Sequence, residues 1–484
     1  MKKSYKIYSA AILFMFFMLG SCKKVIDIEP THTVNGDASF KTIEDYEAAL
    51  TGAYSRLLSV NYYGSSNGSS AFSTLSDMMT DNLFESGESL GNYQNFSHWT
   101  YTADDTNIDA TWLAAYRVIQ QCNLTLRNID ALAATDAGAV NRVKSQALAL
   151  RAFVHFDILR YWGEGTSRNS TVRGIPYVSS FDIEQKPSRL SVKESYDAII
   201  DDLQDAKDLM QDMDKPIQSA TSTASTARGY IDEIAANAIL ARVYNYAGEA
   251  DSAIKYSTLA INARPLASRA NFPLIWQDAS TAEVIWSVKF TPLNSGTGDN
   301  VYYATGNRAS YRPTTNLISL YDQANDIRYS SYFQLRPRGA SNRLVLIKYL
   351  AKQSQLAKPD GITDFKVLRT GEMYLVRAEA YSQKSMDGPA LADLNTLRAA
   401  RINAFVPGVE TGAALVAAID NERRKELVCE GHRWFDLKRS SRTVGRTSNC
   451  TVFCSLDASA REWVWPLPQT EILANPNIEQ TAGY

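Results

Sequence analysis

The sequence predicts a mainly α-helical protein, built as a scaffold of tetratricopeptide-like helix pairs with long irregular loops and a few short strands. Three observations lead to this fold class. Apolar residues recur at three- and four-residue steps over several long segments, as on the buried face of a helix. Two pairs of these segments share a spacing of small residues, which is typical of stacked helical hairpins. Strand-like runs, such as 282–289 and 343–349, are too few for a large sheet.

The chain begins like a bacterial lipoprotein precursor. Three lysines precede the apolar run 8–21, and small residues come directly before Cys22. The run is too short to span a bilayer, and small residues are what a signal peptidase needs at its cleavage site. We expect residues 1–21 to be removed and Cys22 to carry acyl chains that anchor the protein to a membrane. A plain secretory signal with a coincidental cysteine is the alternative.

The rest of the chain is predicted to form a tether and one folded domain. Residues 22–39 are polar and extended in character, which is typical of a linker. Order is expected to begin near Phe40, so that residues 40–484 form the domain. By length alone, two or three domains are an open alternative.

Nine helices are predicted within this domain. Val143, Leu150 and Phe153 mark the buried face of one of them. Ser191 is placed to cap the helix that begins at Val192. The predicted helices span residues 43–58, 110–132, 140–162, 192–213, 230–247, 250–261, 370–381, 389–401 and 413–430.

One internal repeat supports the helix-pair architecture. Small residues stand where two antiparallel helices approach closely, and a glycine stands at the turn between them, as in a tetratricopeptide-type pair. The residues with this spacing are Ala241, Tyr244, Gly248, Ala253 and Ala260. The segments around Ala378 and Ala390 look like a degraded copy with a longer turn, and 110–132 with 140–162 can form a third pair. An ordinary helical hairpin explains any single instance.

Charge and composition exclude some classes of partner. The chain has 50 basic and 52 acidic side chains, so no global field favours nucleic acid. No P-loop, dinucleotide-binding glycine motif or zinc-ligand spacing is present, and we expect neither a cofactor nor a metal. The 26 tyrosines and 8 tryptophans suit a partly wet recognition surface as well as a core.

Aromatic-rich loops carry the functional signal. Residues 61–107 and 265–326 are long irregular stretches, and parts of them interleave flat rings with short amides and carboxylates. Sugar rings have apolar faces that stack on such side chains and hydroxyls that need polar partners, although the same pairing would serve a peptide. The alternative is that the rings only pack the loops onto the helices.

Two patterns formally match catalytic arrangements. Residues 64–68 match the G-x-S-x-G motif around Ser66, but they lack the preceding strand and following helix that a hydrolase needs. Glu426 and Glu430 lie one helical turn apart, and paired carboxylates at such distances can hydrolyse glycosides. Neighbouring Arg and Lys residues can neutralise them, whereas a glycosidase acid keeps a raised pKa. We therefore expect a partly buried ion-pair network there and no enzyme. The four histidines are scattered and supply no base beside a nucleophile.

The cysteines do not form a disulfide scaffold. Cys122 and Cys429 lie within helical patterns and are expected to be buried thiols. Cys450 and Cys454 lie in a polar stretch, where they either close a small disulfide loop or stay reduced.

Short motifs occur in a fixed order nearly end to end. They are residues 22–30, Trp112-x3-Tyr116-x2-Ile119-x3-Asn123, Leu150-Arg151-Ala152 with Tyr161-Trp162-Gly163, Gly174-Ile-Pro176, Glu283-Val-Ile-Trp286, Arg369-x2-Glu372-x-Tyr374, residues 422–439, and Trp465-Pro-Leu-Pro468 through Tyr484. Together they resemble the SusD/RagB family of nutrient-binding lipoproteins. The resemblance implies tetratricopeptide-like helix pairs under a loop-built binding face.

The resemblance also implies a function and a partner. It implies a lipid-anchored, non-enzymatic protein of the outer membrane, facing the cell exterior, that acts as a lid over a SusC-like TonB-dependent transporter. Its ligand would be an oligosaccharide, with a peptide or glycopeptide as the alternative. The family's loops vary in length and content, so ligand residues transfer poorly. By composition and approximate position, the expected ligand-binding residues are Asp81, Asn82, Tyr93, Trp99, Tyr101, Tyr302 and Tyr303.

Overall fold

The computed structural model describes residues 40–64, 72–182, 184–218, 227–291, 298, 300–304, 306–350 and 363–484. The expected signal 1–21, the tether 22–39 with Cys22, and Ser66 lie outside these residues. By the density of contacts the chain divides into Met1–Tyr46 and Glu47–Tyr484. Among the described helices, none combines the length and the apolar character that crossing a bilayer requires.

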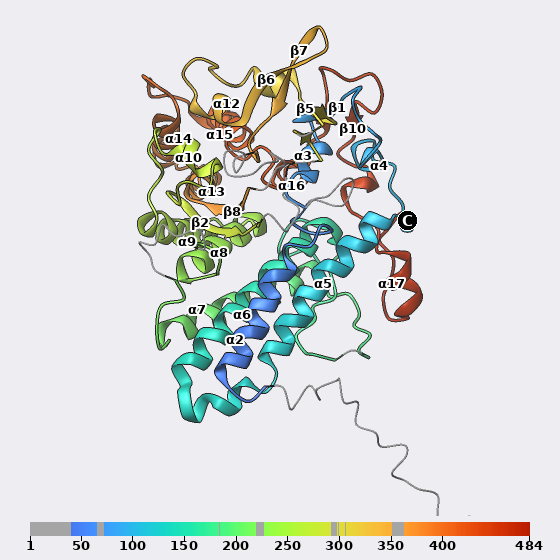
Figure 1. Ribbon diagram of the computed structural model, residues 1–484, viewed down its shortest axis with the longest axis vertical. Helices are drawn as coiled ribbons and strands as arrows, with labels where there is room; N and C mark the ends of the chain where they lie inside the picture. The colour runs from blue at the N-terminus through green and yellow to red at the C-terminus, as the bar shows by residue number, and fades with distance from the viewer. Residues whose placement is uncertain are drawn as a thin grey trace, which may run out of the picture. The chain divides into compact units, whose positions relative to one another are not determined.

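Helices dominate the described residues, and the mainly α-helical prediction is confirmed (Figure 1). The α-helices are α2 (Ile43–Arg56), α3 (Leu75–Met78), α4 (Gln94–Ser97), α5 (Thr106–Leu126), α6 (Ala133–Trp162), α7 (Val192–Gln211), α8 (Glu233–Ala247), α9 (Ala250–Ala263), α10 (Phe272–Trp276), α11 (Thr315–Ile318), α12 (Ile327–Tyr332), α13 (Thr370–Gln383), α14 (Asp387–Arg401), α15 (Gly412–Glu426), α16 (Arg433–Arg439) and α17 (Gln469–Ala474). Two short 3-10 helices, Ile129–Leu132 and Arg461–Trp463, join them.

Each of the nine predicted helices is present, with three larger differences in extent. The helix predicted over 110–132 begins at Thr106 and ends at Leu126. Helix α6 begins at Ala133, seven residues before the predicted start at residue 140. It has a kink at Asp136. The segment predicted as one helix over 413–430 ends at Glu426, and α16 follows as a separate helix. The chain turns between them because Cys429 and Gly431 both adopt positive φ angles, which a continuing helix does not allow.

Local sequence signals fix several helix ends. The Ser191 hydroxyl accepts a hydrogen bond from the Glu194 amide, and the Glu194 carboxylate accepts one from the Ser191 amide, so the predicted cap is a full capping box. Gly248 ends α8 at a φ of +80°, a conformation that glycine adopts without strain. The tight turn that results lets α9 begin two residues later.

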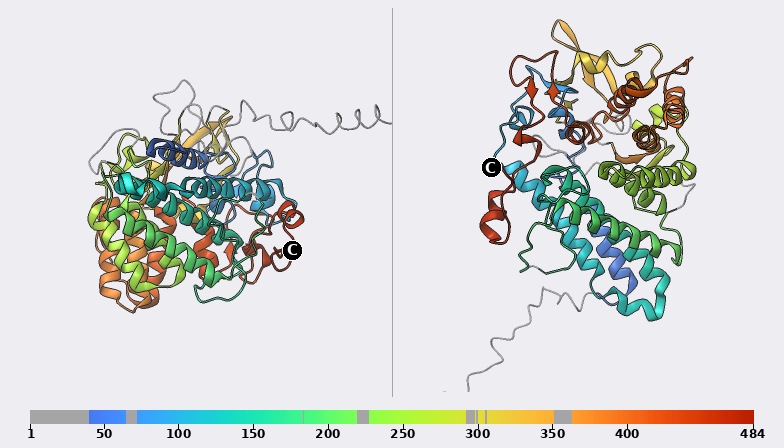
Figure 2. Two further views of the ribbon diagram at one scale, coloured as in Figure 1. Left: turned by 90° about the horizontal axis from the view of Figure 1, so that it is seen from below. Right: turned by 180° about the vertical axis from the view of Figure 1, so that it is seen from behind.

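The helices pack as successive antiparallel neighbours. Contacts join α5 to α6, α6 to α7, α8 to α9, α9 to α13 and α13 to α14, and these helices lie side by side in Figure 2. Within the α8–α9 pair, Ala241, Ala253 and Ala260 are fully buried. The rings of Tyr244 and Tyr256 lie parallel with centroids 5.6 Å apart. The predicted tetratricopeptide-like pairing is therefore confirmed.

The C-terminal segment completes the core around α6. Every residue of α6 from 145 to 162 is buried. The Trp465 ring stacks on Tyr161 with centroids 3.9 Å apart, and the Trp162 indole donates a hydrogen bond to the Pro466 carbonyl. The Trp-Pro-Leu-Pro motif thus packs against the buried C-terminal end of α6.

The strands form five antiparallel pairs in the described part of the chain. They are β1 (Leu83–Glu85) with β5 (Tyr311–Pro313), β2 (Val284–Val288) with β8 (Phe365–Arg369), β3 (Tyr302–Tyr303) with β4 (Arg308–Ala309), β6 (Phe333–Arg338) with β7 (Ser341–Leu346), and β9 (Val444–Gly445) with β10 (Ser455–Leu456). The two strand-like runs of the sequence correspond to β2 and β7. The labelled strands β1, β5, β6, β7 and β10 lie together at the top of Figure 1, where the loops gather.

Candidate binding site

The polar residues expected to bind a ligand form internal ion pairs and hydrogen bonds. The Asp81 carboxylate lies 2.9 Å from Arg433 Nε and 3.4 Å from Arg424 Nη2. Burial would raise the pKa of Asp81, but the charge and hydrogen bonds of Arg433, together with Arg424, outweigh it, so the pKa lies below its usual value. Asn82 is fully buried; its amide donates to Asp77 and its oxygen accepts from Arg424, both at 2.6 Å.

The expected aromatic residues lie mostly inside the protein. Tyr93, Trp99, Tyr101 and Tyr302 are at most 7% exposed. The Trp99 indole and the Tyr101 hydroxyl donate to main-chain carbonyls, and the Tyr302 hydroxyl donates to an asparagine side chain. Tyr303 is half-buried beneath an arginine. In this conformation the four buried rings pack the loops and expose almost no surface for stacking, and their part in ligand binding stays a prediction.

A cavity of about 560 Å³ lies directly beside these buried residues. Three segments build it: the turn that follows β1, helix α4 with His98, and the loop between β9 and β10. Its lining residues are Phe84, Glu85, Ser86, Gly87, Ser89, Gly91, Gln94, Ser97, His98, Arg446, Asn449, Cys450, Thr451 and Val452. The cavity therefore joins part of the predicted loop region 61–107 to a loop that is distant in sequence.

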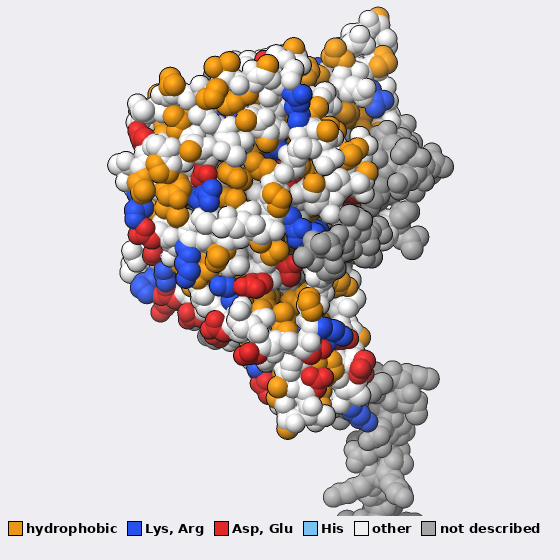
Figure 3. Space-filling model, turned by 90° about the vertical axis from the view of Figure 1, so that its left-hand side faces the viewer, with side chains coloured by type: hydrophobic (Ala, Val, Ile, Leu, Met, Phe, Trp, Pro, Cys, Tyr) orange, Lys and Arg blue, Asp and Glu red, His pale blue; other side chains and the backbone are white. Residues whose placement is uncertain are grey.

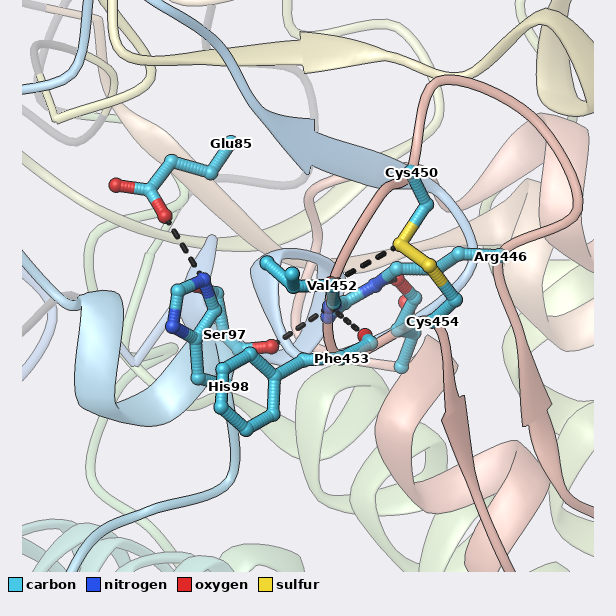
Figure 4. Close-up of a disulfide and its surroundings, with 9 residues drawn as sticks. Glu85, Ser97, His98, Arg446, Cys450, Val452, Phe453 and Cys454 are labelled. Carbon is cyan, nitrogen blue, oxygen red and sulfur yellow. Dashed lines mark hydrogen bonds and ion pairs between the residues drawn. A yellow bond between two sulfur atoms is a disulfide. The ribbon is translucent and has the colours of Figure 1, made fainter.

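The β9–β10 loop is held by a disulfide. Cys450 and Cys454 are bonded, with Cα atoms 5.6 Å apart, which decides between the two alternatives of the sequence. Cys122 and Cys429 are buried free thiols, as predicted. The Arg446 amide also donates to the Cys454 carbonyl at 2.8 Å. Together these bonds define the side of the cavity that this loop forms (Figure 4).

Arg446 lines the cavity and bonds to several of the segments around it. Its guanidinium donates to four main-chain carbonyls, those of Met78, Thr80, Ser97 and Phe453, at 2.7–3.0 Å. It also lies over the Trp99 ring, 4.4 Å from the centroid. Burial lowers the pKa of Arg446 to about 10, so the group stays charged at neutral pH. Trp99 thus packs beneath a residue that joins the segment before β1, helix α4 and the β9–β10 loop.

An aromatic pair stands at the edge of the cavity, where His98 is a lining residue and Phe453 follows the lining residue Val452. The His98 ring stacks on the Phe453 ring, with centroids 4.4 Å apart and an angle of 15° between the planes. His98 Nε2 lies 3.1 Å from the Glu85 carboxylate (Figure 4). Phe453 is 46% exposed, so part of its ring surface faces solvent. An exposed ring next to hydroxyls, an amide and a carboxylate suits a ligand with both apolar faces and hydroxyl groups.

The sequence missed these residues for an identifiable reason. The segment that holds Glu85 and His98 and the loop that holds Arg446 and Phe453 are separated by more than three hundred residues. Composition drew attention to runs of Tyr and Trp, whereas a single phenylalanine in a polar loop gave no such signal. The spacing of Cys450 and Cys454 was the one cue that this loop is ordered.

The paired glutamates of the catalytic alternative lie in a buried ion-pair network, as predicted. Glu426 accepts hydrogen bonds from Arg328, Arg369 and Arg401 at 2.8–3.3 Å, and Arg369 also bonds Glu430. Burial would raise the pKa of Glu426, but the three guanidiniums outweigh it and hold the pKa well below its usual value. A general acid needs the opposite shift.

The cavity offers hydrogen bonds and little reactive chemistry. Among the described contacts, His98 meets a carboxylate and a ring, and no hydroxyl or thiol nucleophile. Within the residues that the structure describes, no group of three or more His, Cys, Asp or Glu side chains could hold a metal ion.

Comparison with known proteins gives consistent matches. Residues 297–484 match the family model described as "SusD family", and residues 32–245 match the model described as "Starch-binding associating with outer membrane". SusD-like protein P2 of Formosa agariphila is 24% identical and covers 98% of both chains. SusD-like protein P38 of the same organism is 22% identical over the full length of both chains.

Solved structures share the fold. A SusD superfamily protein from Bacteroides thetaiotaomicron has a TM-score of 0.79 and 25% identity, covering 91% of this chain and 100% of that one. A Bacteroides vulgatus protein, provisionally described as a sugar binding protein, has a TM-score of 0.76 and 25% identity, covering 92% of this chain and 99% of that one.

Proposed function

The chain belongs to the SusD/RagB family, and we propose that it is a lipid-anchored protein of the outer membrane that captures an oligosaccharide at the cell surface for uptake. One observation carries the proposal: the family scaffold presents a polar cavity, and the exposed ring of Phe453 stacks on His98, which lines it. The sugar ring would stack on Phe453, and its hydroxyls would bond to the polar lining. The protein would bind without turnover.

Two further parts of the proposal concern the surroundings of the protein. Acyl chains on Cys22 would anchor it, because a lipoprotein signal precedes this residue. A SusC-like TonB-dependent transporter would receive the ligand, as membership of the family implies. Fractionation of cells that express Cys22→Ala tests the anchor, and release into the soluble fraction is expected. A pull-down from native membranes tests the transporter, and recovery of no large membrane partner would count against it.

Isothermal titration of the purified protein with panels of glycans and peptides tests the ligand class. We expect glycan binding that Phe453→Ala weakens by up to about tenfold, the range for loss of one stacked ring. Val409→Ala is the matched control, because Val409 is an exposed apolar residue (86%) that does not line the cavity. Tight binding of peptides alone would reject the oligosaccharide. Glycan cleavage during the titration would reject binding without turnover.

A further inference from the structure

Five arginines occupy neighbouring strands beside the cavity, and two of them contact the carboxylate of Glu88. In the β6–β7 register Arg336 lies directly opposite Arg343, and Arg338 lies two residues further along β6, so all three side chains share one face of the hairpin. Two more arginines stand on the neighbouring strands β4 and β5. We define the arginine patch as Arg308, Arg312, Arg336, Arg338 and Arg343.

Glu88 is the carboxylate at the centre of the patch, and its oxygens are already engaged. Arg343 bonds both of them, with Nη2 at 3.0 Å, and Arg338 Nη1 lies at 3.4 Å. The amide of Ala309 donates to the same carboxylate at 2.9 Å. The main-chain carbonyl of Asn307 accepts further bonds from Arg338 and Arg343. Glu88 therefore neutralises one charge and holds the hairpin against β4.

Within the described part of the chain, the other three arginines lie outside the ion pairs of Glu88 and of every other carboxylate. Arg308, Arg312 and Arg336 are half-buried and form no ion pair with any residue that the structure describes, and the Nε atom of each is buried without a hydrogen bond. Arg308 and Arg312 lie over aromatic rings, each 5.5 Å from a centroid. Half-buried guanidiniums of like charge that lack a counter-ion are unfavourable. A bound anion would supply the missing counter-charge and would accept hydrogen bonds from the planar guanidinium groups.

The charge of the molecule is unevenly distributed. The formal net charge is only −2. On the face shown in Figure 3, Asp and Glu side chains gather in the lower half, with Lys and Arg side chains among them. Helix α7, which lies on that side in Figure 1, carries exposed Asp201, Asp205 and Asp208. Three arginines of the patch lie on the β6–β7 hairpin at the top of Figure 1, and Arg312 lies on β5 near it, away from this acidic region.

The patch is continuous with the cavity. Phe84 lines the cavity, and its ring lies under the Arg312 guanidinium. Ser86, the next-but-one residue, also lines the cavity, and its amide donates to the Ser310 carbonyl at 2.9 Å. Ser310 separates β4 from β5, which carry Arg308 and Arg312. A chain of sugar units that leaves the cavity along this side therefore meets the patch.

We propose that the ligand is an acidic oligosaccharide, one whose sugar units carry carboxylate or sulfate groups. One unit occupies the cavity, and the anionic groups of neighbouring units bind the arginine patch. This inference rests on the proposed function and specifies the substrate class of the same site. Each charge-assisted contact that forms strengthens binding by about tenfold or more.

Titration with matched acidic and neutral probes tests this inference. Oligogalacturonate and its methyl-esterified form differ in the carboxylate, and sulfated and desulfated galactan oligosaccharides differ in the sulfate. We expect at least one acidic probe to bind about tenfold or more tightly than its neutral partner, with an affinity that falls as salt rises. The double variant Arg312→Gln/Arg336→Gln should lose that preference. Arg269→Gln, which removes an exposed arginine that is not part of the patch, should keep it.

The outcomes separate this inference from the proposed function. Equal binding of acidic and neutral probes overturns the inference and leaves glycan capture standing. Failure of every glycan to bind rejects the proposed function and the inference with it. Binding to phosphatidylglycerol vesicles through the same arginines, without a preference for acidic glycans, also overturns the inference. If the double variant does not fold, the salt dependence and the paired probes on the unaltered protein still decide the result.

Discussion

Replacing Arg446 by methionine would test whether this residue holds the cavity together. Its guanidinium donates four hydrogen bonds to main-chain carbonyls in three segments of the chain, and it is 7% exposed. Methionine is close in length and apolar, so it fills the space over Trp99 without donating. The substitution therefore removes the bonds while preserving most of the packing.

The expected loss follows from the number and type of these bonds. A hydrogen bond from a charged donor contributes about 1.5–3 kcal/mol, so four of them set an upper limit of about 6–12 kcal/mol. Removing the guanidinium also removes the cost of burying its charge, which is several kcal/mol. Water that enters from the cavity can donate hydrogen bonds to some of the four carbonyls that lose the guanidinium. We expect a net loss of about 3 kcal/mol, which raises the population of the opened cavity by about 150-fold.

Hydrogen exchange measured by mass spectrometry follows this opening directly. Peptides that cover 78–99 and 446–454 should exchange about a hundredfold faster in Arg446→Met, and ligand affinity should fall with them. Arg446→Lys keeps the charge but loses the planar fork, so an intermediate result is expected. Arg442→Met is the control, because that side chain is 40% exposed and pairs with a single aspartate. Unchanged exchange in both segments of Arg446→Met would refute the role of the guanidinium.

Three other changes give measurable outcomes. Replacing Cys450 and Cys454 by serine should lower the free energy of unfolding by about 2 kcal/mol, which is the loop-entropy value for a sequence separation of 4. Equal denaturation curves for the variant and the oxidised protein would contradict this prediction. Glu426→Gln should lower the free energy of unfolding in urea by about 3 kcal/mol, because it leaves buried arginines without a full counter-charge. Glu410→Gln removes a carboxylate from a partly exposed ion pair and should lower it by less than about 1 kcal/mol. Similar losses for both variants would argue against a stabilising network around Glu426. Burial is the main cause that lowers the pKa of His155 to about 3, and the charge of Arg151 adds to it. The unfolded chain binds this proton near pH 6.5 and the native protein only near pH 3, so the free energy of unfolding should fall with decreasing pH in that window, by about 1.4 kcal/mol per unit. In His155→Gln that slope should be smaller, and an unchanged slope would show that other groups cause it.

The helical scaffold was predictable because its signals are local. The periodicity of apolar residues, the capping box at Ser191 and the glycine turn at Gly248 each depend on a few neighbouring residues. The break between α15 and α16 was not predictable in the same way. Cys429 adopts a positive φ angle there, and a cysteine in a helical pattern gives no sign of it.

The binding face was predictable in its region and not in its residues. Composition identifies rings and polar groups in a loop, but it does not tell which face of the loop packs inward. Trp99 and Tyr101 turn inward because their polar atoms find main-chain acceptors there. Phe453 stays exposed because the disulfide loop places it against His98 at the edge of the cavity. That position depends on contacts between distant parts of the chain.

The buried aromatic residues still bear on ligand binding through the groups that they position. Trp99 packs under Arg446, and Arg446 bonds the carbonyls of Ser97 and Phe453, next to the His98–Phe453 pair. A substitution at Trp99 would therefore lower ligand affinity without removing a ligand contact. Loss of affinity alone cannot separate such a supporting residue from a contacting one. Hydrogen exchange separates them, because loss of the supporting residue loosens the cavity segments, whereas loss of the exposed Phe453 ring leaves the bonds of Arg446 in place.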